Sequence, residues 1–297
     1  MEIVTTGRGA PPRSDIGTEI QATLQKVRQS ANGMLPIEVY YHIFESARRA
    51  NGGNFVEIGT AHGAATIAMA LGAKASGKPF HIYTADPFAG RYSSRAEFGT
   101  PDENIRHVLA QFQEYGVRDV ISLAVGNCET LLNGNDIRKI AFLLIDADGR
   151  IDLDLLQLYE RLEPGAAVVV DDVDEGVFLR CAADRTYFVD LKHRITCLLL
   201  KWMEEKEYLT NRYTIHSTAF CVRGSRSMDQ MQFAQLALEA YRQLVFSPLE
   251  GERWNDFFRL YEDRGQASRA LRLYASVPPV IMRSLGRIHR LGSRLLK

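Results

Sequence analysis

The sequence predicts an α/β protein: a doubly wound, mostly parallel sheet with a C-terminal antiparallel hairpin, followed by a C-terminal helical extension. Strand-like and helix-like segments alternate from residue 54 to residue 170, which indicates successive βαβ units. The segments Ile140–Ile145 and Ala166–Val170 are almost wholly apolar, which is typical of central parallel strands covered on both faces. Finally, one residue separates Arg212–His216 from Thr218–Arg223, and strands joined so closely can pair only antiparallel.

The individual elements follow from hydrophobic spacing and from the residues that start or stop helices. Apolar residues after Met34 recur at helical spacing, Pro36 suits a first helical turn, and glycines follow Asn51. In the first part of the chain we expect helices over 18–31, 34–50, 63–75, 101–115, 127–132 and 153–162. We expect parallel strands over 54–59, 80–85, 120–125, 140–145 and 166–170.

The pattern changes after Asp172. One long amphipathic helix is expected over 187–209, ahead of the hairpin. From Gly224 onward the pattern is helical only, with helices expected over 228–246, 252–263, 266–275 and 279–296. The chain is therefore expected to comprise a tail and short helix at 1–33, a main domain at 34–224 and a helical extension at 225–297.

Composition indicates a globular protein of the cytoplasm. Apolar residues make up 46% and charged residues 24% of the 297 residues, which is ordinary for such proteins. Basic and acidic residues are equal at 36 each, which argues against a dedicated nucleic-acid binder. No apolar run approaches the ~20 residues that cross a bilayer, and the first 17 residues lack the apolar stretch of a secretory signal. The four cysteines lack metal-binding spacing, which favours free thiols in a reducing compartment.

The strongest local signal is the glycine-bearing turn VEIGTAHG at 56–63, between a strand and a helix. Such a turn lets a ligand approach the backbone and the free N–H groups of the helix N-terminus. Its glycines, Gly59 and Gly63, have GxxxG spacing rather than the GxGxxG spacing of dinucleotide binders. Glu57, two residues before the first glycine, is unusual for a pyrophosphate site. The alternative is a plain tight turn.

Two polar residues follow the next strands. Asp86 ends the second strand, at the distance from the glycine turn where an acid accepts hydrogen bonds from ribose hydroxyls. Its alternative role is to cap the turn before Pro87. Asn127 follows the third strand and either lines an adenine site or caps the next short helix, and both roles remain open.

Acidic residues follow the fourth and fifth strands: Asp146 and Asp148, and then Asp171 and Asp172. Neighbouring parallel strands place them on one edge of the sheet, where like charges raise each other's pKa or require a cation such as Mg²⁺ or Ca²⁺. The alternative is a solvated acidic wall. His62, within the glycine turn, is a candidate acid or base, and its alternative role is to shape the turn.

These motifs in this order resemble the class I S-adenosylmethionine (SAM)-dependent methyltransferases, which have a Rossmann-like sheet. The resemblance covers about residues 34–223 and rests on VEIGTAHG, TADPF, LLIDADG, EPGAAVVVDD and the final hairpin. It is strongest for the branch of catechol, caffeoyl-CoA and macrocin-type O-methyltransferases. That branch often has Lys or His where this chain has Gly149, and often has Ser after the glycine turn where this chain has Ala64-Ala65-Thr66.

The resemblance implies SAM as cofactor and O-methylation of a small-molecule or carbohydrate acceptor, and the balanced charge predicts no nucleic-acid partner. Cofactor-binding residues would be Glu57, Gly59, Thr60, Ala61, His62, Gly63, Asp86, Asn127 and Asp146. Asp146, Asp171 and Asp172 would bind Mg²⁺, and the catalytic residues would be Asp146, Asp148 and His62. Two alternatives remain: a non-catalytic scaffold with the same fold, and an NAD-type oxidoreductase, which the absence of GxGxxG disfavours.

The last helix, at 281–297, is basic and amphipathic. Such a helix lies on an anionic membrane surface, or packs against its own domain or a partner subunit, as in a homo-oligomer.

Overall fold

The structure is a computed structural model that describes residues 17–88, 100–147, 151–181, 187–246 and 258–260. The chain divides into two compact units, which are considered separately. The first comprises Met1–Val173 and Leu199–Ala240, and the second comprises Asp174–Leu198 and Tyr241–Lys297. The boundary at Leu198 falls within helix α7 (Lys192–Glu205). The domain boundaries expected from the sequence stay a prediction.

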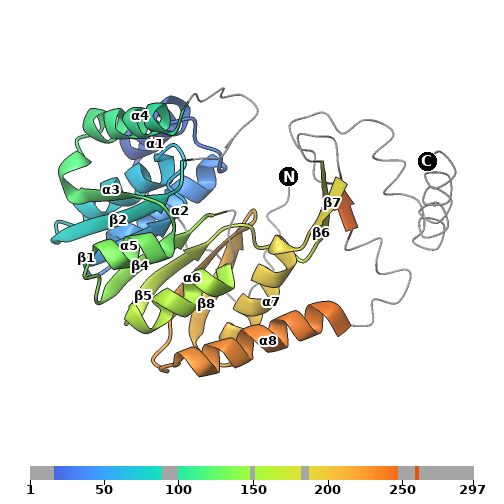
Figure 1. Cartoon of the computed structure of the whole chain (residues 1–297). Helices are drawn as coiled ribbons and strands as arrows, with labels where there is room; N and C mark the ends of the chain where they lie inside the picture. Colours follow the sequence, from blue (N-terminus) through green and yellow to red (C-terminus); the bar gives the residue numbers. More distant parts are fainter. Residues whose placement is uncertain (1–16, 89–99, 148–150, 182–186, 247–257, 261–297) are drawn as a thin grey trace, which may run out of the picture. The chain divides into compact units, whose positions relative to one another are not determined.

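The first unit contains a seven-stranded sheet with the order β3-β2-β1-β4-β5-β9-β8 (Figure 1). The strands are β1 (Gly53–Ile58), β2 (Phe80–Asp86), β3 (Ile121–Val125), β4 (Ile140–Ile145), β5 (Leu162–Val170), β8 (Leu209–Ile215) and β9 (Thr218–Arg223). β1 to β5 pair in parallel, and β9 pairs antiparallel with both β5 and β8. The predicted mostly parallel sheet with a terminal hairpin is therefore confirmed.

Helices cover both faces of this sheet (Figure 1). The helices that precede β5 are α1 (Thr18–Ser30), α2 (Ile37–Arg49), α3 (Ala64–Ala75), α4 (Pro101–Glu114), α5 (Cys128–Gly134) and α6 (Ile151–Leu158), with short 3₁₀ turns at Arg118–Val120 and Tyr159–Arg161. α1, α2 and α3 pack together, and α5 packs against α6. Every residue of β4 is buried, as its apolar sequence predicts.

The alanine-rich helix α3 lies unusually close to its neighbour α2. A Cβ added to Gly72 would lie 2.2 Å from the carbonyl oxygen of Phe44, so the backbones approach to a distance that only glycine permits. Small side chains at Ala68 and Ala73 are buried in the same core. This close packing fixes the C-terminal part of α3 against α2, while the N-terminus of α3 follows the glycine turn after β1.

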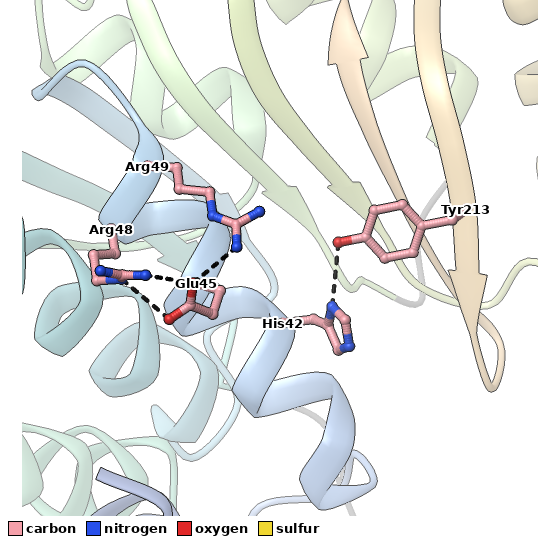
Figure 2. Close-up of polar contacts among 5 residues, drawn as sticks. All are labelled: His42, Glu45, Arg48, Arg49 and Tyr213. Carbon is pink, nitrogen blue, oxygen red and sulfur yellow. Dashed lines mark hydrogen bonds and ion pairs between the residues drawn. The ribbon is translucent and has the colours of Figure 1, made fainter. Parts of the chain in front are cut away.

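Polar and aromatic contacts tie α2 to the edge strand β8 (Figure 2). His42 Nδ1 lies 3.2 Å from the Tyr213 hydroxyl, and the Tyr213 ring stacks on Phe220 with centroids 5.2 Å apart. Burial, with a further contribution from the Arg49 charge, lowers the pKa of His42, which favours the neutral ring. One turn further along α2, Glu45 is only 5% exposed and accepts hydrogen bonds from Arg48 and Arg49.

The strand order places a topological switch between β1 and β4. From β1 the chain adds β2 and β3 on one side, and then crosses to add β4 and β5 on the other. Loops that leave the carboxyl ends of β1 and β4 diverge at such a point, and ligands of open α/β sheets bind in the resulting crevice. The fold therefore predicts a ligand-binding site near Gly59 and Asp146, which follow these two strands.

The second unit contains a three-stranded sheet with the order β10-β6-β7. β6 (Val177–Cys181) pairs antiparallel with β7 (Tyr187–Asp190) and parallel with β10 (Phe258–Leu260). Two predictions are corrected here. The helix expected over 187–209 begins only at Lys192, whose N–H donates to Asp190 Oδ1, because Tyr187–Asp190 is a strand of β-favouring residues. The helix expected over 252–263 is wrong at Phe258–Leu260, which pair with β6 instead.

Helix α8 (Gln230–Phe246) confirms the first helix of the predicted extension. The helices expected over 266–275 and 279–296, including the basic helix at 281–297, lie outside the described residues. In the part of the chain that the structure describes, no helix combines the length and apolar character needed to span a bilayer.

Candidate active site

The glycine turn, which follows β1, lies in very close contact with the end of the neighbouring strand β4. Gly59 has a φ of +101°, and a Cβ added there would lie 1.9 Å from the carbonyl oxygen of Asp146. The Gly59 N–H donates to Ala85 on β2, and the Asp146 N–H donates to Ile58 on β1. Gly59 is thus required both by its left-handed backbone and by the approach of the neighbouring strand end.

Asp86 supports this turn from the end of β2. Its Oδ2 accepts a hydrogen bond of 2.9 Å from the Ala61 N–H, and its Oδ1 accepts one of 2.7 Å from the Phe88 N–H. Ala61 has a φ of +45°, an unusual conformation for alanine that the Asp86 carboxylate stabilises. These two contacts give Asp86 the turn-capping role that the sequence offers as an alternative, and hydrogen bonds from ribose hydroxyls stay a prediction.

Glu57 lies beneath the turn and is fully buried, with 0% exposure. Its Oε2 accepts hydrogen bonds from the hydroxyls of Thr66 on α3, at 2.5 Å, and Thr84 on β2, at 2.6 Å. Thr84 in turn lies 2.5 Å from the Thr60 hydroxyl of the turn, so the network joins the turn, both strands and the helix. Burial raises the pKa of Glu57 to about 7, opposed by the two threonine hydroxyls and assisted by the charge of Asp86.

Replacement of Glu57 by glutamine is expected to stabilise the protein in a pH-dependent way. Because the pKa rises from 4.5 to about 7 on folding, ionisation of Glu57 opposes folding increasingly as pH rises through this interval. Relative to the wild type, Glu57→Gln should change the free energy of unfolding little at pH 5 and raise it by up to about 3 kcal/mol at pH 8. Urea unfolding at both pH values measures this difference. The control Glu129→Gln, on the exposed surface of α5, should show no such trend, and an equal effect of both variants would contradict the assignment.

His62 lies near the end of the turn, next to Gly63, which precedes α3, and is 2% exposed. Burial, with a contribution from the neighbouring His107 ring 6.5 Å away, lowers the pKa of His62 to about 4. Above about pH 5 the ring is therefore neutral, so it can accept a proton or share a hydrogen bond, but it does not carry a positive charge to the site.

A narrow cleft opens between the glycine turn and the segment that precedes α2. Four parts of the fold contribute to its wall: the loop between α1 and α2, helix α2 itself, the glycine turn with the start of α3, and the end of β4. The lining residues are Asn32, Gly33, Met34, Leu35, Tyr40, Gly59, Thr60, Ala61, His62, Ala64, Ala65 and Asp146. Five of the site residues predicted from the sequence therefore line one cleft: the four from Gly59 to His62, and Asp146. Glu57 is not among the lining residues.

Asp146, Asp171 and Asp172 form an acidic triad at the ends of β4 and β5, with one carboxylate oxygen of each within 4.8 Å of the others. Adjacent residues of a strand point to opposite faces, but Asp172 has a φ of +58°, a turn that allows both carboxylates to lie on the side of Asp146. Thr218, the first residue of β9, donates a hydrogen bond of 2.5 Å to Asp171 Oδ1. Three partly buried carboxylates so close together suit a hard divalent cation, since oxygen is its preferred ligand.

The other predicted site residues have different positions. Asn127 caps α5, where its Oδ1 accepts from the Thr130 N–H at 3.0 Å, which is one of the two roles left open by the sequence. Gly63 adopts a φ of +83° as the residue before α3. Asp148 lies outside the described residues.

Sequence reasoning missed several residues that shape this site. The sequence identifies Thr84 only as part of a strand and Thr218 only as the start of a hairpin, and it marks Thr66 only as part of a segment where similar proteins often have Ser. Tyr40 was counted as part of an amphipathic helix, yet it lines the cleft. Only the three-dimensional arrangement relates these residues to the motifs, because each bonds across at least five positions of sequence.

Comparison with known proteins agrees with this geometry. Residues 56–173 match a family model described as a methyltransferase domain, a range that begins in β1 and ends directly after Asp172. This range includes the glycine turn, Asp86 and the whole acidic triad. No curated protein matches the chain.

Solved structures of similar fold include two candidate methyltransferases. One is a candidate caffeoyl-CoA O-methyltransferase from Staphylococcus aureus, with 18% identity, coverage of 70% of this chain and 93% of the other, and a TM-score of 0.50. Another is a candidate O-methyltransferase from Klebsiella pneumoniae, with 15% identity, coverage of 71% and 92%, and a TM-score of 0.48. At these identities the similarity concerns the fold. Residues 56–173 thus match a methyltransferase domain, and the resemblance of the chain to the class I SAM-dependent methyltransferases is confirmed.

Proposed function

We propose that this protein uses SAM to methylate a hydroxyl group of a small-molecule or carbohydrate acceptor, with the assistance of a divalent cation. The observation that carries this proposal is the position of Asp146. Its side chain belongs to the acidic triad, and the residue also lines the cleft beside the glycine turn. A cofactor in that cleft and a cation on the triad would therefore be neighbours.

The residues around the cleft suit the parts of SAM. Asp86, at the end of β2, would accept hydrogen bonds from ribose hydroxyls, while Gly59 brings the backbone of the glycine turn to the wall of the cleft. Asp146 supplies negative charge for the ammonium group and for the sulfonium, which carries the methyl group that is transferred. A direct contact between Glu57 and the cofactor stays a prediction, and the buried Glu57 carboxyl group supports the glycine turn through Thr66 and Thr84.

Methyl transfer breaks the carbon–sulfur bond of the sulfonium as the acceptor oxygen forms the new carbon–oxygen bond. The sulfonium becomes a neutral thioether, and the hydroxyl proton passes to solvent. Bound to the triad, Mg²⁺ would lower the pKa of the acceptor hydroxyl and hold it in place. The chain's own contribution is to orient the triad. Thr218 holds the Asp171 carboxylate, and the left-handed backbone at Asp172 turns the next carboxylate to the same side.

Isothermal titration with SAM, in the presence and absence of Mg²⁺, is the experiment that tests this proposal. Micromolar binding that becomes tighter with Mg²⁺ is the expected result, because the cation would compensate the charge of the triad next to the cofactor. Binding of SAM with no response to Mg²⁺ would contradict the role of the cation alone. Absence of SAM binding under both conditions would contradict the proposed activity.

A further inference from the structure

Tyr40 is a buried phenol that lines the cleft without having been assigned any role by the sequence motifs. It lies on α2, is 2% exposed, and shares the cleft wall with Gly59, Ala64 and Asp146. Its hydroxyl oxygen accepts a hydrogen bond of 3.3 Å from the Leu35 N–H. Within the described part of the chain, no oxygen accepts the hydroxyl's own proton. Tyr40 therefore presents a buried donor at the cleft.

The Tyr40 hydroxyl lies close to the N-terminus of α3. A Cβ added to Gly33 would lie 2.5 Å from the Tyr40 hydroxyl oxygen and 3.0 Å from the Cβ of Ala64. The Tyr40 hydroxyl and the Ala64 side chain thus border the same small space beside Gly33. The N–H groups in the first turn of a helix have no acceptor within the helix and carry partial positive charge, which favours an anion. The twelve-residue helix α3 adds this donor set to the one from Tyr40.

The first two side chains of α3, those of Ala64 and Ala65, line the cleft and carry no hydrogen-bond donor. The next side chain, Thr66, donates its hydroxyl to Glu57. Tyr40 is placed to contribute a donor from α2. Burial raises the pKa of Tyr40, the Leu35 N–H opposes this, and the negative charges of Asp146 and Asp171 raise the pKa further, which keeps the hydroxyl protonated.

The chemistry of the cleft matches an amino-acid zwitterion. The Asp146 carboxylate suits an ammonium group, whereas the Tyr40 hydroxyl and the first turn of α3 suit a carboxylate. The methionine portion of SAM carries both groups on one carbon atom. Given the proposed function, on which this inference rests, we propose that the Tyr40 hydroxyl donates a hydrogen bond to the α-carboxylate of SAM at the start of α3. Tyr40 is then a residue that selects cofactors with an intact carboxylate.

A comparison of two ligands and three proteins tests this assignment. The ligands are SAM and decarboxylated SAM, which retains the sulfonium and the ammonium group but lacks the carboxylate. The proteins are the wild type, Tyr40→Phe, and the control Tyr41→Phe, which removes the hydroxyl that accepts from Gln25 on α1, outside the cleft. Hydrogen bonds to charged groups predict that Tyr40→Phe weakens SAM binding by roughly tenfold or more and leaves the affinity for decarboxylated SAM unchanged.

The two ligands separate a direct contact from an indirect effect. Tyr40→Phe also removes the acceptor of the Leu35 N–H, and any resulting shift of the loop would weaken both ligands equally. If Tyr40→Phe lowered the affinity for both ligands equally, or did not lower the affinity for SAM, the Tyr40 assignment would be overturned and the proposed function would stand. Failure of the wild type to bind SAM would overturn the proposed function and this assignment with it. Tyr41→Phe should bind both ligands as the wild type does, and thermal unfolding of each variant verifies that it is folded.

Discussion

Replacement of Asp146 by asparagine is expected to remove both divalent-cation binding and tight SAM binding. The substitution keeps the side chain's size but deletes one of three carboxylates that lie within 4.8 Å of one another. It also deletes negative charge from the wall of the cleft. Since an anionic oxygen is a far better ligand for a hard cation than an amide, we expect the affinity for Mn²⁺, used as a probe for Mg²⁺, to fall on the order of 100-fold.

Calorimetric titration of Mn²⁺ and of SAM into each variant measures both losses. Asp136→Asn is the matched control, because Asp136 is also a loop aspartate but pairs on the surface with Arg138, with 72% of its side chain exposed. The control should bind both ligands as the wild type does. If Asp146→Asn binds Mn²⁺ and SAM with wild-type affinity, Asp146 does not join a cation site to a cofactor site. A loss of SAM binding alone would restrict Asp146 to the cofactor.

Replacement of Gly59 by alanine should destabilise the protein and abolish SAM binding. The new Cβ would lie 1.9 Å from the carbonyl oxygen of Asp146, so either the turn or the end of β4 must move. Such overpacking, added to the positive φ, is expected to lower the free energy of unfolding by about 3 kcal/mol. The displacement would also disturb the cleft that Gly59 and Asp146 line together.

Gly165→Ala provides the control for backbone strain. Gly165 has a φ of +85°, similar in sign to that of Gly59, but no described atom lies within 4 Å of an added Cβ. It should therefore lose only the ~1 kcal/mol that a left-handed alanine costs, and SAM affinity should not change. Urea unfolding and SAM titration of both variants separate the two contributions. Equal destabilisation by the two substitutions would show that the close approach to Asp146 is unimportant.

The parts of the fold predicted correctly are those with strong local patterns. β4 and β5 are recognisable because burial on both faces requires an unbroken apolar run. β7 was missed because its residues continue without a break into the apolar positions of α7, and a periodicity window merges the two. The only local sign of the boundary was Asp190, whose carboxylate caps the start of the helix.

The site was predictable where one loop carries the relevant residues, and was not where several elements meet. The glycine turn and the acids after β4 and β5 could be found because parallel strands bring their carboxyl ends together. Tyr40 could not, because its position on α2 resembles that of any core aromatic until the contact with Leu35 and the cleft is known. The fully buried state of Glu57 likewise depends on Thr66 and Thr84, which come from other elements.

The left-handed backbone at Asp172 limits how this position can change during evolution. Among residues with a side chain, asparagine and aspartate tolerate a φ near the observed +58° best, whereas β-branched residues do not. Both tolerated residues carry an oxygen that can bind a hard cation. Substitutions that preserve the backbone are thus mainly those that also preserve an oxygen ligand. The backbone conformation at Asp172 therefore favours the retention of an oxygen ligand at this position. An exchange of aspartate for asparagine here would lower the negative charge of the triad without a change in the backbone of the loop.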